Sequence, residues 1–209
     1  MSPITSVKKP PFEAELEALV GDCQSLLDVG CGPESPIKTF SKRIHTVGVD
    51  AFEANLHKSR DHQIHDDYVS LDIRKLEEAF KPDSFDCVMA LDVIEHLDKA
   101  EGEKLLASME RIARKKIIVF TPNGFLPQGM YESNPWQVHL SGWTAEEMKQ
   151  KGYEVIGLRG WKPLRGPYAT IRYRPKFFWL FVSSLSQPWV RRRPEKAFQL
   201  LCVKNKSQR

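Results

Sequence analysis

The chain has 209 residues, of which 41% are hydrophobic and 28% are charged, and its mean hydropathy is −0.41. This composition favours a folded globular protein and excludes both a disordered chain and a polytopic membrane protein. The formal net charge is +4, but residues 159–196 hold ten Lys or Arg and one acid, so this segment carries +9 and the remainder −5. We therefore expect a mildly acidic body with a basic C-terminal region.

The four cysteines indicate a reducing compartment. Cys23, Cys31, Cys87 and Cys202 form no CxxC pair and have no zinc-finger spacing, and no apolar signal segment follows Met1. We expect free thiols and a cytoplasmic protein, with peripheral contact to the inner face of the membrane as a further option.

Hydrophobic patterns predict alternating strands and helices along the chain. The expected strands are 25–29, 44–50, 68–73, 84–94, 116–122, 153–160 and 196–205, and the expected helices are 11–22, a segment ending at Arg43, 99–114 and 144–151. Thr144 and Glu147 form the pattern of a capping box. The alternation favours a parallel α/β sheet with right-handed crossovers. We expect one domain over 1–209, with an aromatic, basic and α-helical insertion at about 160–195.

The turn after the first strand has the sequence Gly30-Cys31-Gly32-Pro33-Glu34-Ser35. It lacks the third glycine of the dinucleotide motif, and Glu34 lies where a pyrophosphate would need a bare, positive helix N-terminus. A diphosphate ligand is therefore not expected here.

Three carboxylates end successive predicted strands, and together they describe a different ligand. Asp28 suits a cationic group, Asp50 suits both hydroxyls of an adenosine ribose, and Asp72 suits the amino group of adenine. An adenosine ligand without phosphate and with a positive end is S-adenosylmethionine.

These segments resemble the class I S-adenosylmethionine-dependent methyltransferase family, in its small-molecule, type 11/12-like branch. LLDVGCGPE is similar to motif I, VGVD to motif II, LDI to the adenine-contacting motif, and FDCVMALDVIEHL to the fourth-strand motif. The resemblance covers about residues 12–160. It implies a Rossmann-like, doubly wound α/β fold whose seven-stranded sheet is mostly parallel with an antiparallel last strand. The cofactor contacts assigned to S-adenosylmethionine are Asp28, Gly30, Cys31, Gly32, Asp50, Ala51, Asp72, Ile73 and Leu91.

Two histidines are the candidate catalytic residues. His96 directly follows the fourth strand, and His139 lies in the loop after the fifth strand; either suits a base that deprotonates an acceptor hydroxyl. Asp92, Glu95 and His96, joined by His139, also have the spacing of a metal site. That set resembles the magnesium site of RNA 2′-O-methyltransferases and of some ubiquinone-pathway O-methyltransferases, although the RNA enzymes have Glu where this chain has Asp92. A divalent metal is an option that we do not expect.

Two aromatic features have open interpretations. Trp136, Trp143 and Trp161 suit either an acceptor wall or ordinary packing. The apolar run 177–190 lies between basic residues, so that 172–193 forms a lid over the acceptor, a contact with an anionic membrane, or a helix that covers a sheet edge.

The sequence thus predicts a methyltransferase (EC 2.1.1.-) for a small or lipid-linked metabolite. The basic C-terminal region favours an anionic acceptor, and we expect methylation at oxygen. One alternative is a metal-dependent RNA 2′-O-methyltransferase, although nucleic acid is the less favoured partner because no known RNA-binding module is present. The other is a catalytically inactive cofactor-binding module associated with a membrane or a partner. The sequence does not fix the oligomeric state.

Overall fold

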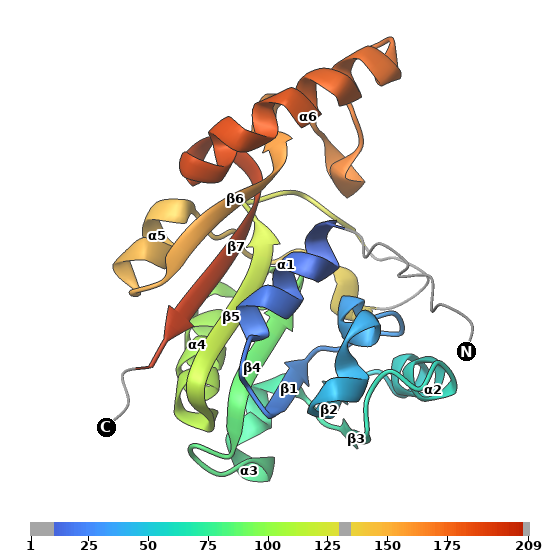
Figure 1. Ribbon diagram of the computed structural model, residues 1–209, viewed down its shortest axis with the longest axis vertical. Coiled ribbons are helices and arrows are strands. Elements are labelled where there is room, and N and C mark those ends of the chain that lie inside the picture. Colours follow the sequence, from blue (N-terminus) through green and yellow to red (C-terminus); the bar gives the residue numbers. More distant parts are fainter. Residues whose placement is uncertain (1–10, 130–134, 207–209) are drawn as a thin grey trace, which may run out of the picture.

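The computed structural model describes residues 11–129 and 135–206, and it shows a sheet with helices on both faces (Figure 1). The strands are β1 (Ser25–Val29), β2 (His45–Asp50), β3 (Asp67–Ser70), β4 (Phe85–Leu91), β5 (Ala113–Pro122), β6 (Glu154–Trp161) and β7 (Ala197–Asn205). The α-helices in these ranges are α1 (Pro11–Val20), α2 (Glu53–Asp61), α3 (Leu76–Ala79), α4 (Lys99–Ile112), α5 (Ala145–Gln150) and α6 (Lys176–Arg192).

The seven strands form one sheet in the order β3-β2-β1-β4-β5-β7-β6. Strand β7 is antiparallel to both β5 and β6, whereas the neighbours from β3 to β5 are parallel. The predicted fold, mostly parallel with an antiparallel last strand, is confirmed. The strand order reverses between β1 and β4, and ligands of open α/β sheets bind at such a switch point, outside the carboxyl ends of the strands.

Helices cover both faces of the sheet because its central strands are apolar on both sides. On one face, Leu16 of α1 packs in a cluster with Ile118 of β5. On the other, Leu105 and Met109 of α4 pack in a cluster with Ile117. The predicted capping box of α5 is present, since the Thr144 hydroxyl accepts from the backbone N–H of Glu147 and the Glu147 carboxylate accepts from that of Thr144.

The prediction of an α-helix ending at Arg43 is wrong. The segment instead forms two short 3₁₀ turns, η1 (Pro36–Thr39) and η2 (Ser41–Arg43). Phe40 separates them with a non-helical φ of −138°, because its side chain turns into the core. Two prolines in the first half also leave few residues for a regular α-helix. Helix α2 was not predicted, because its sequence is polar and has little apolar periodicity.

The predicted insertion contains α6, which packs along β6, the edge strand of the sheet. In Figure 1 this helix lies at the top of the molecule and extends beyond the sheet. Within the described residues, none of the helices combines the length and hydropathy that a membrane span requires.

Candidate functional site

A cleft opens at the carboxyl ends of the central strands, at the switch point between β1 and β4. Its lining combines acidic, apolar and aromatic side chains: Gly30, Asp50, Ala51, Asn55, Asp72, Ile73, Asp92, Val93, His96, Leu97, Trp136 and Gln137. Of the nine predicted cofactor contacts, this lining includes Gly30, Asp50, Ala51, Asp72 and Ile73.

Gly30 forms the tight turn that lets the backbone enter the cleft. Its φ is +67°, and an added Cβ would lie 2.7 Å from the Cγ2 atom of Val93. Both the conformation and the space therefore require glycine. A ligand at this turn would meet bare backbone.

Asp50 is a carboxylate that backbone N–H groups hold in place at the cleft. Its Oδ1 accepts from the backbone N–H of Phe52 at 2.8 Å, and its Oδ2 accepts from that of Gly32 at 3.0 Å and from the Asn55 amide at 3.3 Å. Since each carboxylate oxygen has two lone pairs, Oδ1 retains acceptor capacity for a ligand hydroxyl. Gly32 thus acts by orienting Asp50 rather than by lining the cleft.

Asp28 lies beneath the cleft, not in its wall. Its carboxylate is 1% exposed, and Oδ2 contacts the Ser35 hydroxyl at 2.6 Å and Nε2 of His65 at 3.0 Å. The structure therefore shows Asp28 bracing the motif I turn. His65 lies in a polar stretch of the sequence, but its ring is buried against Asp28.

Cys31 and Leu91 also lie outside the cleft lining. The Cys31 side chain is buried, its backbone N–H donates to the Val49 carbonyl, and burial raises the pKa of its thiol, so it has no nucleophilic character at neutral pH. Leu91 packs, partly buried, against the core cluster that contains α1.

Asp72 lines the cleft but is bound to a neighbouring guanidinium. Its Oδ1 accepts from the backbone N–H and Nε of Arg74, and its Oδ2 lies 2.5 Å from an Arg74 terminal nitrogen. These bonds lower the pKa of Asp72. Arg74 also pairs with Glu101 and stacks at 5.4 Å over Trp136, so this corner of the cleft is a connected polar wall.

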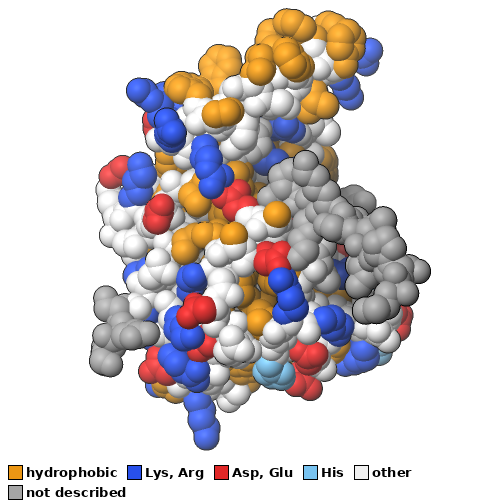
Figure 2. Space-filling view, in the orientation of Figure 1, with side chains coloured by type: hydrophobic (Ala, Val, Ile, Leu, Met, Phe, Trp, Pro, Cys, Tyr) orange, Lys and Arg blue, Asp and Glu red, His pale blue; other side chains and the backbone are white. Residues whose placement is uncertain are grey.

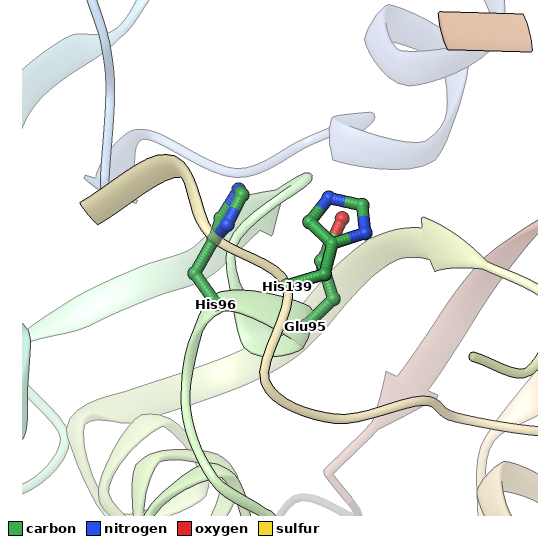
Figure 3. Close-up of side chains that lie close together, drawn as sticks. All are labelled: Glu95, His96 and His139. Atoms are coloured by element: carbon green, nitrogen blue, oxygen red, sulfur yellow. The ribbon is translucent and has the colours of Figure 1, made fainter. Parts of the chain in front are cut away.

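Glu95, His96 and His139 come together beside the cleft (Figure 3). One potential ligand atom from each lies within 4.8 Å of the others, and the two imidazole rings meet edge to face at 4.9 Å between centroids. Glu95 is 2% exposed, its Oε2 accepts from the Thr121 hydroxyl, and within 11–129 and 135–206 its Oε1 has no hydrogen-bond partner unless a proton is shared with Asp92. The fourth predicted ligand, Asp92, is not part of this cluster.

Asp92 faces the cleft from a strained turn. Its φ is +52°, and its Oδ1 accepts from the Gln199 amide at 3.2 Å. Desolvation of this carboxyl by the surrounding protein raises its pKa to about 6. Burial, and then the charge of Asp92, raise the pKa of Glu95 well above its ordinary value. The surroundings of Asp92 and Glu95 therefore favour a pair with one negative charge over a pair with two.

Both histidines are neutral at physiological pH. Burial lowers the pKa of His96 to about 4, with a further contribution from His139, and burial also lowers the pKa of His139. Nδ1 of His139 lies 2.6 Å from the Leu126 carbonyl. Because a carbonyl only accepts, Nδ1 carries the proton and Nε2 has the free lone pair. This tautomer suits either a general base or a metal ligand.

A second cavity of about 590 Å³ is lined in part by Leu126, whose carbonyl contacts Nδ1 of His139. Its volume is typical of a small-molecule pocket. Four basic residues and one acid line it: Lys162, Arg165, Arg172, Lys196 and Glu195. Within the described residues none of the four basic side chains forms an ion pair. With Glu195 as the one acid, the lining has an excess of three positive charges, and burial lowers the pKa of both Lys162 and Arg165.

The three tryptophans have three different positions. Trp136 lines the cleft, Trp161 lines the second cavity, and Trp143 is fully buried and donates to the Ile94 carbonyl. Trp143 is therefore a packing residue, whereas Trp136 and Trp161 lie in cavity walls. Asn55, Val93, Leu97 and Gln137 were missed; only Asn55 had a usable signal, a polar residue five positions after Asp50.

The comparisons with known proteins agree with this geometry. Residues 27–120 match a family model described as a methyltransferase domain. Among curated proteins, none matches the chain significantly. The predicted resemblance to class I methyltransferases is confirmed.

Solved structures share the fold. A SAM-dependent methyltransferase from Archaeoglobus fulgidus is 16% identical, with a TM-score of 0.61 and coverage of 93% of both chains. The methyltransferase domain of bacterial CtHen1 is 18% identical, with a TM-score of 0.57 and coverage of 93% of this chain and 97% of that one. Magnesium protoporphyrin IX methyltransferase from Synechocystis PCC 6803, solved with bound SAM, is 14% identical, with a TM-score of 0.51 and coverage of 87% and 69%.

Proposed function

Because residues 27–120 match a methyltransferase domain, we propose that the protein transfers a methyl group from S-adenosylmethionine to an oxygen of a small or lipid-linked, anionic acceptor. One observation carries the proposal. The cleft at the switch point contains both the Gly30 turn and the Asp50 carboxylate, and the cluster of Glu95, His96 and His139 lies beside it.

The residues of the cleft fit this cofactor. Asp50 has acceptor capacity for the ribose hydroxyls, and Ile73 and Leu97 provide apolar surface for the adenine ring. Asp72 supplies negative charge at the same wall. When bound, the cofactor supplies an activated methyl group on a sulfonium, so the protein has mainly to position the acceptor and remove its proton.

The second cavity provides a place for the acceptor. Its unpaired cations, Arg172 and Lys196 among them, favour a phosphate or carboxylate, and the planar guanidinium group is well suited to both. His139 contacts one residue of each site: its ring meets His96, which lines the cleft, and its Nδ1 meets the carbonyl of Leu126, which lines the second cavity. We assign it the role of base: Nε2 accepts the proton of the acceptor hydroxyl while Leu126 fixes the ring.

Calorimetry tests the cofactor, and product formation tests the reaction. We expect S-adenosylhomocysteine to bind tightly and NAD not to bind, and release of S-adenosylhomocysteine from S-adenosylmethionine only with hydroxyl compounds that carry phosphate or carboxylate. Tight NAD binding would contradict the assignment. Cofactor binding without turnover across such a panel would favour an inactive binding module instead.

The Glu95 cluster favours one second candidate, a metal-dependent methyltransferase such as an RNA 2′-O-methyltransferase. The buried Oε1 atom without a partner and the two neutral imidazoles form a donor set that suits a divalent cation. A cation there would supply positive charge for the acceptor oxygen.

A chelator separates the two candidates. For a metal enzyme, chelation should abolish turnover and added Mg²⁺ or Mn²⁺ should restore it. The Glu95→Gln variant should have no turnover. For the base mechanism, turnover should survive chelation, whereas His139→Ala should lower kcat by about 10²–10⁴-fold.

A further inference from the structure

Helix α6 presents its large apolar side chains to solvent. Phe177, Phe181 and Leu185 are 78%, 60% and 64% exposed, and they follow one another at every fourth position along one side of the helix. Two more apolar side chains on this outer side are at least 44% exposed, Phe178 and Trp189, and Leu180, nearer the inner side, is 50% exposed. Figure 2 shows the resulting hydrophobic patch at the top of the molecule, over α6. Soluble proteins seldom expose such a contiguous patch without a partner for it.

The inner face of the same helix combines the fully buried Val190 with small and polar side chains that are hydrogen-bonded to the edge strand. Gln187 accepts from the backbone N–H of Gly160 and donates to the carbonyl of Gly157, and the Ser186 hydroxyl accepts from the backbone N–H of Trp161. Ser183, almost fully buried, completes this face and accepts from Arg165. Helix α6 is therefore amphipathic in the reverse sense of a helix that covers a sheet.

The seat of α6 keeps this orientation. A Cβ atom added at Gly157 would lie 2.1 Å from the carbonyl oxygen of Val190, so the helix backbone approaches β6 as closely as glycine allows. Rolling the helix to bury Phe181 would break the side-chain bonds to β6 and force bulky rings into this contact. The predicted alternative of a helix that covers a sheet edge is thus present, but Ser186 and Gln187 make the contact with β6, and Phe181 stays outside it.

Positive charge flanks the apolar patch at both ends. Arg174 and Lys176 are exposed at the start of α6, and Arg192 and Arg193 are exposed at its end; among the residues that the structure describes, these four form no ion pair. Arg191, in contrast, pairs with Glu15 of α1 at 2.6 Å. The helix contains no Asp or Glu. Basic side chains lie beside the hydrophobic patch in Figure 2.

We propose that α6 is a membrane-docking helix that lies flat in the surface of an anionic lipid bilayer. Seventeen residues make a helix about 25 Å long, with one apolar side for the acyl boundary and basic ends for the headgroups. Interfacial aromatic rings such as Trp189 suit the headgroup level.

A second copy of the chain fits this patch less well than lipid. Pairing two α6 helices across a two-fold axis would bring basic helix ends near one another, and the helix has no acid to compensate them. An anionic surface satisfies the apolar stripe and the basic ends together. Docking is independent of methyl transfer, but it would bring the second cavity, which shares Arg172 with the segment leading into α6, close to the lipid.

Vesicle co-sedimentation tests the proposal with two variants. The apolar variant replaces Phe177, Phe181 and Leu185 by Ser, and the charge variant replaces Lys176, Arg192 and Arg193 by Gln; all six side chains are exposed, so neither variant removes core packing. The matched control replaces three exposed lysines elsewhere, Lys58, Lys81 and Lys104, by Gln.

We expect the wild type and the control to sediment with vesicles of phosphatidylcholine mixed with phosphatidylglycerol, and not with phosphatidylcholine alone. The charge variant should bind about fivefold more weakly per lost cation, or roughly a hundredfold in all, and rising salt should weaken wild-type binding because charges are screened over ~8 Å at physiological salt. The apolar variant should lose binding at every salt concentration.

Affinity for S-adenosylhomocysteine should be the same in all variants, so that failure of docking and failure of the proposed function are distinguishable. Circular dichroism would verify that each variant is folded. Absence of wild-type binding to anionic vesicles would overturn the proposal. A dimer in solution that the apolar variant dissociates would also overturn it, because the patch would then be a self-association surface.

Discussion

The cofactor cleft and helix α6 use polar side chains in opposite places. At the cleft, polar groups such as Asp50 lie at the opening and apolar strands lie behind them, as in most α/β enzymes. At α6, polar groups such as Gln187 lie inside, bonded to β6, and apolar groups such as Phe181 lie outside. The difference teaches that an apolar pattern in a sequence indicates a partner surface but does not say whether that surface belongs to the same molecule.

The largest effect that we expect is on the cleft. Asp50→Ala removes a charged acceptor for the cofactor hydroxyls, which should weaken binding of S-adenosylhomocysteine by roughly 1.5–3 kcal/mol per lost bond, about tenfold to a hundredfold for the first. Isothermal titration calorimetry measures this change. Asp67→Ala is the control. It removes an exposed carboxylate at the start of β3, and it should leave the affinity for S-adenosylhomocysteine unchanged. Equal affinity in the two variants would show that Asp50 only braces the turn.

Next in size is the inner face of α6. Ser183→Leu places a bulky side chain in the tight contact with Gly160, where overpacking should lower the free energy of unfolding by about 1–3 kcal/mol. Urea denaturation followed by circular dichroism measures the loss. A gain in stability would mean that the helix can roll and bury its apolar side, which would contradict the orientation described above.

A smaller effect is expected at the ion pair between α6 and α1. Arg191 is about half-exposed, so Arg191→Gln should lower the free energy of unfolding by only about 0–1 kcal/mol. The same denaturation experiment at low and high salt should show the difference shrinking as salt rises. An unchanged difference at high salt would indicate a packing role for the Arg191 stem.

The smallest effect is expected on the outer face. Phe181→Ser removes a ring that is 60% exposed, so the free energy of unfolding should change by no more than about 0.5 kcal/mol. Ser183→Leu lies only two residues further along α6 but on its inner face. A comparison of the two variants therefore shows how the effect on stability depends on the face of the helix. Strong destabilisation by Phe181→Ser would show that the ring packs on the body of the protein.

Much of the fold was predictable because each strand carries its own signal. The buried run from Phe85 to Leu91 and the glycine turn after Val29 are local patterns, and their order along the chain implies the sheet. The two 3₁₀ turns before β2 were not predictable, since only the packing of Phe40 into the core decides against an α-helix. Helix α2 was hidden by its polar composition.

The candidate site was predictable in part for the same reason. Asp50 ends β2 and Asp72 lies two residues after the end of β3, and the carboxyl ends of parallel strands converge on one cleft whatever the details of packing. Asp28 also ends near that edge, but its side chain points into a pair with His65, 37 residues away, and no local pattern announces such a contact. The second cavity is harder still, because it brings together Leu126, Arg165 and Lys196 from separate loops.

The bonds between α6 and β6 have a consequence for handling the protein. An unpaired edge strand is a template on which other chains add as further strands, and natural sheets protect such edges. Gln187 and Ser186 occupy backbone groups of Gly157, Gly160 and Trp161 that would otherwise be available for this pairing. A shortened form that lacks residues 162–196 would lose the hydrophobic patch. It would also expose the edge of β6, on which other chains could add as strands and aggregate. Serine substitutions on the outer side of α6 are the better route to a well-behaved sample.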